Sequence, residues 1–418
     1  MFKNRSILSG SAAFFTAACL IFLLCGGCTL FESGETLAAP VEKLDQRLVD
    51  AGNGFGFNLF LSLAESEPQG NLFISPAGIM TALAMTYNGA AGDTERAMAE
   101  TMMLDQMTLE EVNLAFADLL TILRNPDPDL ELAIANSTWA REGIDFYEDF
   151  IDRVVEYFGA TAESLDFSRP DAADRINAWV SENTRGAIDG IVDPPIDPDT
   201  VLFLINTIYF KGEWNEPFDP ELTTNQPFHL PGGEIINHPI MFRNDEFRYF
   251  ENETMQIVEL PYGQNSRVGM YIILPAEEPG LQGLYSELNS DTWQAWTRSL
   301  SMQQGQVGLP RFQFEYEKTL NDYLVALGME PAFNEKVSDF SNMRPEPPNL
   351  FISEVKHKTF IEVNEEGTEA AAATSVEMAP TSAPPGEPFV MIADRPFFFA
   401  IADNMTGTIL FMGSLVTP

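Results

Sequence analysis

Apolar residues follow two different spacings along the chain, and these spacings predict its helices and strands. A spacing of three to four residues predicts helices over 41–66, 109–123, 147–158, 171–184, 281–299 (as two helices) and 319–327. Continuous or alternating apolar runs predict strands over 131–140, 201–210, 246–250, 256–260, 268–274, 307–314, 350–363, 397–402 and 409–415. The segment NLFISPAGIMTALAM predicts a short strand and then a buried helix, with Ser75 and Pro76 at the start of that helix.

The order of these elements indicates the fold class. Helices mostly precede strands instead of alternating with them, which favours an α+β fold with large antiparallel sheets. The run 201–210 is almost entirely apolar, as expected for a strand buried on both faces. We find no internal repeat and no linker after residue 41, so residues 41–418 are expected to form one domain.

The stretch EEGTEAAAATSVEMAPTSAPP, residues 365–385, supports two local structures. Its four consecutive alanines favour a short helix that Thr368 caps. With a period of two, however, Thr368 and every second residue up to Met378 are small or medium-sized and uncharged, while the charged residues fall on the other face. This second pattern is typical of a strand with one buried face. Pro380 and the prolines after it end either structure.

The first 28 residues predict export. Lys3 and Arg5 precede an apolar run over 14–24, which is too short for a membrane span and is typical of a signal peptide. The run ends in LCGGC, which looks like a bacterial lipoprotein signal with Cys28 as the lipidated residue, although Cys25 stands where that pattern usually has Leu.

The resulting division is a signal peptide over 1–27, a tether over 28–40 and the folded domain. Two alternatives remain, namely secretion with cleavage near Ala38, or an uncleaved anchor. The expected location is therefore a cell surface or periplasm on a lipid anchor, or else the secreted fraction.

Charge and cysteine content exclude several function classes. The net charge is −39, and loss of residues 1–27 would bring it to −41, from 21 basic and 62 acidic residues. Such a surface repels phosphate backbones, so nucleic-acid binding and heparin-type activation are not expected. All three cysteines lie within the first 28 residues, which leaves the folded domain without disulfides, thiol nucleophiles or thiolate metal sites.

We find no catalytic signature. The chain has only three histidines, His229, His238 and His357, and none has metal-ligand spacing. No nucleophile elbow, phosphate-binding loop or dinucleotide fingerprint is present. The sequence therefore predicts a protein that is not an enzyme and that carries neither a metal nor a cofactor.

Six segments, in order along the chain, resemble the serpin family. They are NLFISPAGIMTALAMTYNGAAGDT, INAWVSENTRGAIDGIV, LINTIYFKGEWNEPF, LPRFQFEYEKTLNDYLVALGMEPAF, VKHKTFIEVNEEGTEAAAAT and DRPFFFAIADNMTGTILFMG. The resemblance runs from about residue 45 to 417. It implies a single α+β domain with about nine helices, three β-sheets and an exposed reactive-centre loop at about 365–388.

The resemblance also implies a mechanism, the covalent trapping of a serine protease. The protease attacks the loop and forms an acyl-enzyme, after which the freed loop enters the main sheet as a new strand and distorts the protease. Because the protease supplies the chemistry, this chain needs no catalytic residue.

Residues 365–373 match the family's hinge, where the loop begins to enter the sheet. They are Glu365, Glu366, Gly367, Thr368, Glu369, Ala370, Ala371, Ala372 and Ala373. A charge on the entering face would be buried without a partner, at a cost of several kcal/mol. That face is free of charge here, which favours an inhibitor over the alternative, a non-inhibitory serpin that acts as a surface binding protein.

The family's usual loop length places the cleaved bond between Thr381 and Ser382. Thr381 is uncharged and β-branched, which suits the small pocket of elastase-like or subtilisin-like proteases. The segment after the bond is a few residues longer than in antitrypsin-like members, which leaves the register open by one residue. We expect a monomer.

Five further positions match family positions around the opening of the sheet. Ser75, Asn206 and His357 match a polar network between the central strands, although Gly78 stands where many members have a second serine. Trp214 matches an aromatic residue at the top of the sheet, and Arg311 matches the ion-pair partner of Glu365. Plain core packing and a surface salt bridge worth about 0–1 kcal/mol are the structural alternatives for these positions.

Overall fold

The structure is a computed structural model of the 418-residue chain. It describes residues 44–124, 127, 130–144, 146–198, 200–344, 350–368 and 387–418, without the side chains of Ala133, Leu204 and Asn206. All of these residues belong to one compact unit that spans residues 39–418. Within the described part, no helix is long and apolar enough to cross a membrane.

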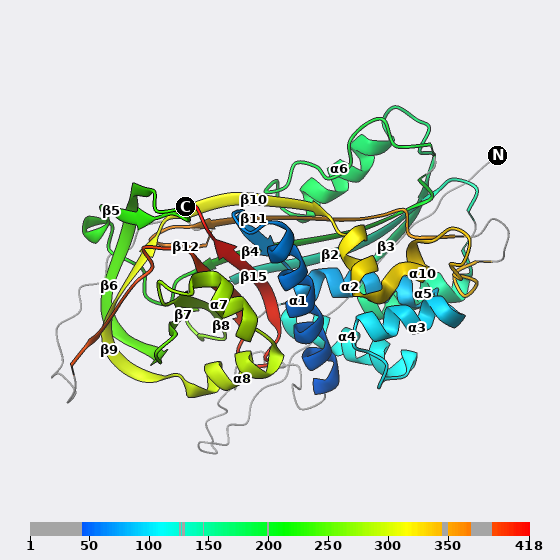
Figure 1. The fold of residues 1–418 in the computed structure, drawn as a ribbon. Helices are drawn as coiled ribbons and strands as arrows, with labels where there is room; N and C mark the ends of the chain where they lie inside the picture. The colour runs from blue at the N-terminus through cyan, green and yellow to red at the C-terminus, as the bar shows by residue number, and fades with distance from the viewer. Residues whose placement is uncertain are drawn as a thin grey trace, which may run out of the picture. The chain divides into compact units, whose positions relative to one another are not determined.

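The described helices surround the sheets (Figure 1). They are α1 (Gln46–Ser66), α2 (Pro76–Tyr87), α3 (Gly92–Thr101), α4 (Leu109–Leu123), α5 (Glu148–Phe158), α6 (Ala172–Asn183), α7 (Gly280–Glu287) and α8 (Ser290–Ser299), then α9 (Asn321–Leu324) and α10 (Glu330–Phe333), which a π-helical turn at Val325–Met329 joins. If this last run counts as one helix, the described residues contain the nine helices expected, besides one 3₁₀ turn at Pro220–Leu222.

The last helical run differs from the sequence prediction. We expected Gly328 to end a helix begun at residue 319, and this glycine, whose φ is 118°, does interrupt the helical geometry. The difference is the short helix α10, which begins two residues later and was not predicted.

A six-stranded sheet is formed in the order β10-β11-β12-β4-β2-β3. Its strands are β2 (Leu130–Arg141), β3 (Thr161–Leu165), β4 (Leu202–Glu213), β10 (Phe312–Thr319), β11 (Glu354–Val363) and the two-residue β12 (Gly367–Thr368). Figure 1 shows α6 over one face of this sheet and α1 and α2 over the other.

The remaining strands form a nine-stranded sheet. They are β1 (Leu72–Ile74), β5 (Thr224–His229), β6 (Ile235–Glu251), β7 (Met255–Tyr262), β8 (Val268–Pro275), β9 (Ser301–Pro310), β13 (Phe389–Ile392), β14 (Phe397–Asp403) and β15 (Ile409–Leu415). Residues 235–240 of β6 pair with β5, residues 240–249 pair with β9, and the last four residues pair with β7. Among the described residues, the hydrogen-bonded strands therefore form two sheets, because β6 pairs in turn with β5, β9 and β7 and joins these strands into one.

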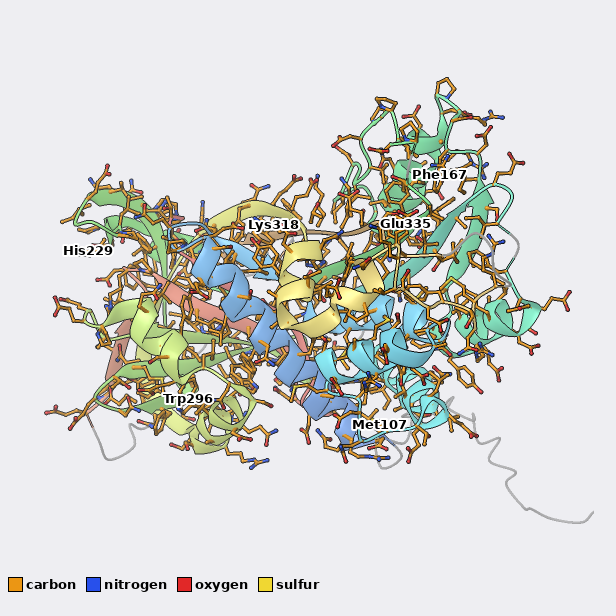
Figure 2. All side chains as sticks on the ribbon, turned by 45° about the vertical axis from the view of Figure 1, so that its right-hand side comes forward. Met107, Phe167, His229, Trp296, Lys318 and Glu335 are labelled. Carbon is orange, nitrogen blue, oxygen red and sulfur yellow. The ribbon has the colours of Figure 1, made fainter. Side chains whose placement is uncertain are left out.

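Both faces of β4 are buried, as its apolar run predicts. Leu202, Ile208 and Phe210 belong to the main hydrophobic core. Phe203 and Ile205 belong to a second core beneath α6. Phe167, which is labelled in Figure 2, belongs to the same core, and its ring centroid lies 5.4 Å from that of Phe203. Because both faces of β4 are packed, the strand is held in place, and its backbone groups can pair with another strand beside it.

Candidate functional site

Several of the predicted site residues lie outside the described residues. They are Cys28, Glu369, Ala370, Ala371, Ala372, Ala373, Thr381 and Ser382. The described part of the site is the entrance to the six-stranded sheet, where β11 ends and the predicted loop begins.

Strands β4 and β11 pair directly with each other over only a short length. Their parallel register covers Glu354–His357 of β11 and Phe203–Asn206 of β4. Six residues further along each strand, Val363 and Gly212 both pair with Thr368 of β12. The two strands are thus joined directly at one end, and at the other end a third strand, represented by two residues, has entered between them.

The turn that leads into β12 is extensively hydrogen bonded. The backbone N–H groups of Glu366 and Gly367 donate to Asn364 Oδ1, and the N–H of Asn364 donates to the carbonyl of Gly367. A Cβ atom on Gly367 would clash with the carbonyl oxygen of Gly212. Only glycine therefore fits where the chain passes this close to β4.

Arg311 and Glu365 form the ion pair that the sequence predicts. Arg311 Nε donates to Glu365 Oε1 at 2.8 Å, and the hydroxyl of Thr223 donates to the same oxygen. The Glu365 side chain is only 7% exposed, so this is a partly buried pair rather than a surface salt bridge. Burial acts to raise the pKa of Glu365, but the hydrogen bonds from Arg311 and Thr223 outweigh it, and this pKa lies below its ordinary value.

Trp214 lies beside the same turn. Its indole Nε1–H donates to the carbonyl of Asn364 at 2.9 Å, and its backbone N–H donates to the carbonyl of Glu366 at 2.8 Å. The ring of Trp214 stacks on Tyr262, with centroids 4.4 Å apart and planes 13° apart. Trp214 therefore holds the turn to the sheet by two hydrogen bonds.

Thr368 is buried, although we predicted that the loop would be exposed from about residue 365. It is 2% exposed, and Tyr262, which is fully buried, lies with its hydroxyl 2.7 Å from Thr368 Oγ1. No sequence pattern selected Tyr262 or Thr223, because each contacts the hinge only through the tertiary fold. Asn364 directly precedes the hinge, and its contacts lie within the turn itself.

Ser75 and His357 are in contact at the other end of the gap between β4 and β11. Ser75 caps α2, since its Oγ accepts from Gly78 N–H at 3.1 Å and donates to the carbonyl of Leu410 at 2.7 Å. The backbone N–H of Ser75 donates to His357 Nε2 at 3.2 Å. This contact connects α2 to β11 at the last residue that pairs with β4.

His357 is buried and neutral. Burial lowers the pKa of its imidazole to about 3, and within the described residues its Nδ1 has no hydrogen-bond partner. Asn206 lies directly opposite His357 on β4, as the backbone register shows. Among the described side chains this buried ring nitrogen has no partner, and a hydrogen bond to such an atom would lower its desolvation cost.

The entrance shows no arrangement of groups for catalysis or metal binding. Among the described residues, no three histidine, cysteine or carboxylate side chains are grouped so that they could hold a metal ion. The polar groups of the site instead hold backbone segments together, as the hydrogen bonds of Trp214 and Asn364 show.

Comparison with known proteins identifies this architecture. Residues 50–418 match the family model described as serpin (serine protease inhibitor). The chain belongs to the serpin family.

Two similar serpins come from very different organisms. An uncharacterised serpin-like protein of Thermococcus kodakarensis is 38% identical over 382 residues, which cover 90% of this chain and 87% of that protein. The human leukocyte elastase inhibitor is 36% identical over 384 residues, which cover 89% of this chain and all of that protein. The second relative is named as an inhibitor of an elastase.

Two solved structures are similar to this serpin over most of its length. Tengpin, a thermophilic serpin in its native state, has a TM-score of 0.83 and 30% identity over 90% of this chain and 95% of tengpin. Human thyroxine-binding globulin, in complex with thyroxine, has a TM-score of 0.82 and 27% identity over 89% of this chain and 99% of that chain. The α+β serpin fold is thereby confirmed.

Proposed function

We propose that this serpin is an irreversible inhibitor of serine proteases and acts as a suicide substrate. The protease serine attacks the carbonyl of Thr381, the bond to Ser382 breaks with its nitrogen leaving as an amine, and an ester joins Thr381 to the protease. Insertion of the freed segment between β4 and β11 then carries the protease away before water can hydrolyse the ester.

The register of β12 carries this proposal. Thr368 pairs with Gly212 of β4 and Val363 of β11. If the cleaved loop continues in the same register, every second residue after Thr368 enters the inner face two positions further along both strands. These residues are Ala370, Ala372 and Thr374, opposite Phe210, Ile208 and Asn206 of β4 and Ile361, Thr359 and His357 of β11.

This register suits the sequence, because the inner face of the new strand would receive only small, uncharged side chains. Thr374, six residues after Thr368, would then place its hydroxyl beside His357. The Nδ1 atom of His357 lacks a hydrogen-bond partner among the described residues. The insertion would therefore bury no unpaired charge on that face and could satisfy one buried polar atom.

We propose elastase-like or subtilisin-like targets, since Thr381 is small and uncharged. The human relative that is named as an elastase inhibitor supports this class. A panel of elastase-like, subtilisin-like and trypsin-like proteases would test it, with SDS gels to detect covalent complexes and mass spectrometry to locate the cut. We expect a complex with the first two classes and release of residues 382–418. Cleavage of the loop with no stable complex would instead indicate a non-inhibitory serpin.

We also propose export, with a lipid anchor on Cys28. The support is the order of basic residues, apolar run and LCGGC at the start of the chain. In cells that process lipoproteins, radiolabelled palmitate should enter the wild type but not Cys28→Ser. Labelling of neither protein, with a mature chain that begins near Ala39, would establish ordinary secretion instead.

A further inference from the structure

The uncut molecule already holds the first residue of the strand that loop insertion would build. Thr368 is 2% exposed and pairs with β4 on one side and β11 on the other. Thr368 is the last residue that the structure describes before Glu387. Something must hold this residue in place, because a two-residue strand has very few backbone contacts of its own.

The side chains around Thr368 form a socket for its hydroxyl. Tyr262 supplies the polar contact, with its hydroxyl 2.7 Å from Thr368 Oγ1. The floor of the socket is Gly212, where a Cβ would lie 2.9 Å from the Phe210 ring and 3.0 Å from the Tyr262 ring. A larger residue at 212 would therefore press on the Tyr262 and Phe210 rings and on Leu130, which lies 2.8 Å from the same Cβ position.

The Tyr262 ring is fixed from two sides. It stacks on Trp214, and it meets Phe210 edge-on with centroids 5.0 Å apart. Burial raises the pKa of the Tyr262 phenol far above its ordinary value, with a smaller opposing effect from its hydrogen bond to Thr368, so the hydroxyl remains protonated at neutral pH. Outside the socket, a buried phenol without a partner would carry a desolvation cost.

We propose that Tyr262 is a positioning residue for loop insertion, which holds Thr368 in the register that the cleaved loop extends. This inference rests on the proposed inhibitory function. The same contact can persist after cleavage, because Thr368 need not move while the residues after it enter the sheet. Insertion then starts from strand pairing that already exists. It should therefore be faster relative to hydrolysis of the acyl-enzyme.

The test compares two conservative substitutions. Tyr262→Phe removes the hydroxyl that faces Thr368. Tyr271→Phe is the matched control, because Tyr271 is also buried and donates its hydroxyl to Asn404 Oδ1 at 2.6 Å, in a contact separate from the hinge. Thr368→Val removes the other hydroxyl while it retains the branched shape, and it serves if Tyr262→Phe does not fold.

The first measurement is hydrogen exchange at Gly367 and Thr368 in the uncut protein. We expect exchange about fivefold faster in Tyr262→Phe and in Thr368→Val, the factor that one neutral hydrogen bond supplies. The double variant should be no faster than either single variant, since both remove the same bond. Tyr271→Phe should match the wild type, and unchanged exchange in Tyr262→Phe would overturn the proposal.

The second measurement is the number of inhibitor molecules consumed for each protease molecule trapped. This number should rise at least twofold in Tyr262→Phe, whereas the initial rate of loop cleavage and the behaviour of Tyr271→Phe stay unchanged. If exchange is faster but the number of inhibitor molecules consumed per trapped protease is unchanged, the contact holds the hinge without affecting trapping. That result would overturn the positioning role of Tyr262.

The two hypotheses fail in different ways. If the wild type traps none of the proteases, the proposed function is wrong. Insertion can still be followed in that case, because an inserted loop should raise the unfolding temperature of the cleaved protein. The unfolding temperature would be followed over time after cleavage. If it rises equally fast in the wild type and in Tyr262→Phe, Tyr262 has no role in insertion.

Discussion

Arg311 Nε lies 2.8 Å from a carboxylate oxygen of Glu365, and the pair joins the start of β10 to the turn before β12. Arg311→Ala should remove the charged donors from a carboxylate that is only 7% exposed. We expect a loss of about 1–3 kcal/mol in the free energy of unfolding of the uncut protein, measured by urea denaturation. Arg311→Lys should retain part of this stabilisation, because it keeps a positive charge near Glu365. If Arg311→Ala is as stable as the wild type, the hydrogen bond from Thr223 alone is sufficient to stabilise the Glu365 carboxylate.

A charge at the hinge should separate cleavage from trapping. In Thr368→Arg, a guanidinium would have to enter a socket whose polar atom is the Tyr262 hydroxyl, and burial of an unpaired charge costs several kcal/mol. The loop should still be cut after Thr381, but the acyl-enzyme should be hydrolysed, so that the inhibitor becomes a substrate. Gel analysis of timed mixtures would show this, and unaltered trapping would contradict insertion through this socket.

The register of β12 predicts a role for Thr374 that appears only after cleavage. Thr374→Val should leave the unfolding temperature of the uncut protein unchanged and lower that of the cleaved protein, because only the inserted strand would place this hydroxyl beside His357. The expected loss is about 1–2 kcal/mol. Ser375→Ala is the control, since its side chain would face outward, and equal effects of the two variants would indicate a different register.

The identity of the residue before the cleaved bond should decide which protease is trapped. Thr381→Arg should shift trapping from elastase-like to trypsin-like enzymes, whose pocket carries a carboxylate. Rate constants for complex formation with one enzyme of each class would measure the shift. The same substitution at Pro380 should not produce it, and an absence of any shift in Thr381→Arg would place the cleaved bond elsewhere in the loop.

His357 should make the uncut protein less stable in weak acid. Its pKa is about 3 in the folded state and near 6.5 when unfolded, so between these values the unfolded chain binds the extra proton. Stability should therefore fall as the pH falls from 6.5 toward 3, by up to about 1.4 kcal/mol per pH unit. Unfolding temperatures of the wild type and His357→Gln should converge as the pH falls.

His229→Gln is the control for this pH dependence, because His229 is exposed on β5 (Figure 2). Its pH profile should run parallel to that of the wild type. If the His357→Gln profile also runs parallel to the wild type, the imidazole of His357 does not remain neutral in the folded protein.

The sequence predicted those features that depend on local pattern or on family motifs. The apolar run at 201–210 predicted a strand buried on both faces, and β4 is such a strand. The motif match placed Arg311 near Glu365, which lies 54 residues further along the chain. A local apolar pattern was sufficient in the first case, and position within a motif was sufficient in the second.

The features that the sequence missed depend on contacts between distant segments. Tyr262 ends an ordinary apolar strand, and only the approach of β7 to β4 brings its hydroxyl to Thr368. The burial of Thr368 was missed for a similar reason, because alternation along one strand shows which residues share a face but not where the strand enters its sheet.

The short direct contact between β4 and β11 has a consequence for attempts to engineer this protein. Substitutions that lengthen this pairing would make the uncut form more resistant to heat, and they would also close the space that the loop must enter. Selection for thermal resistance alone should therefore yield molecules that survive heating yet release active protease. A screen that seeks durable inhibitors needs to score both properties in the same round.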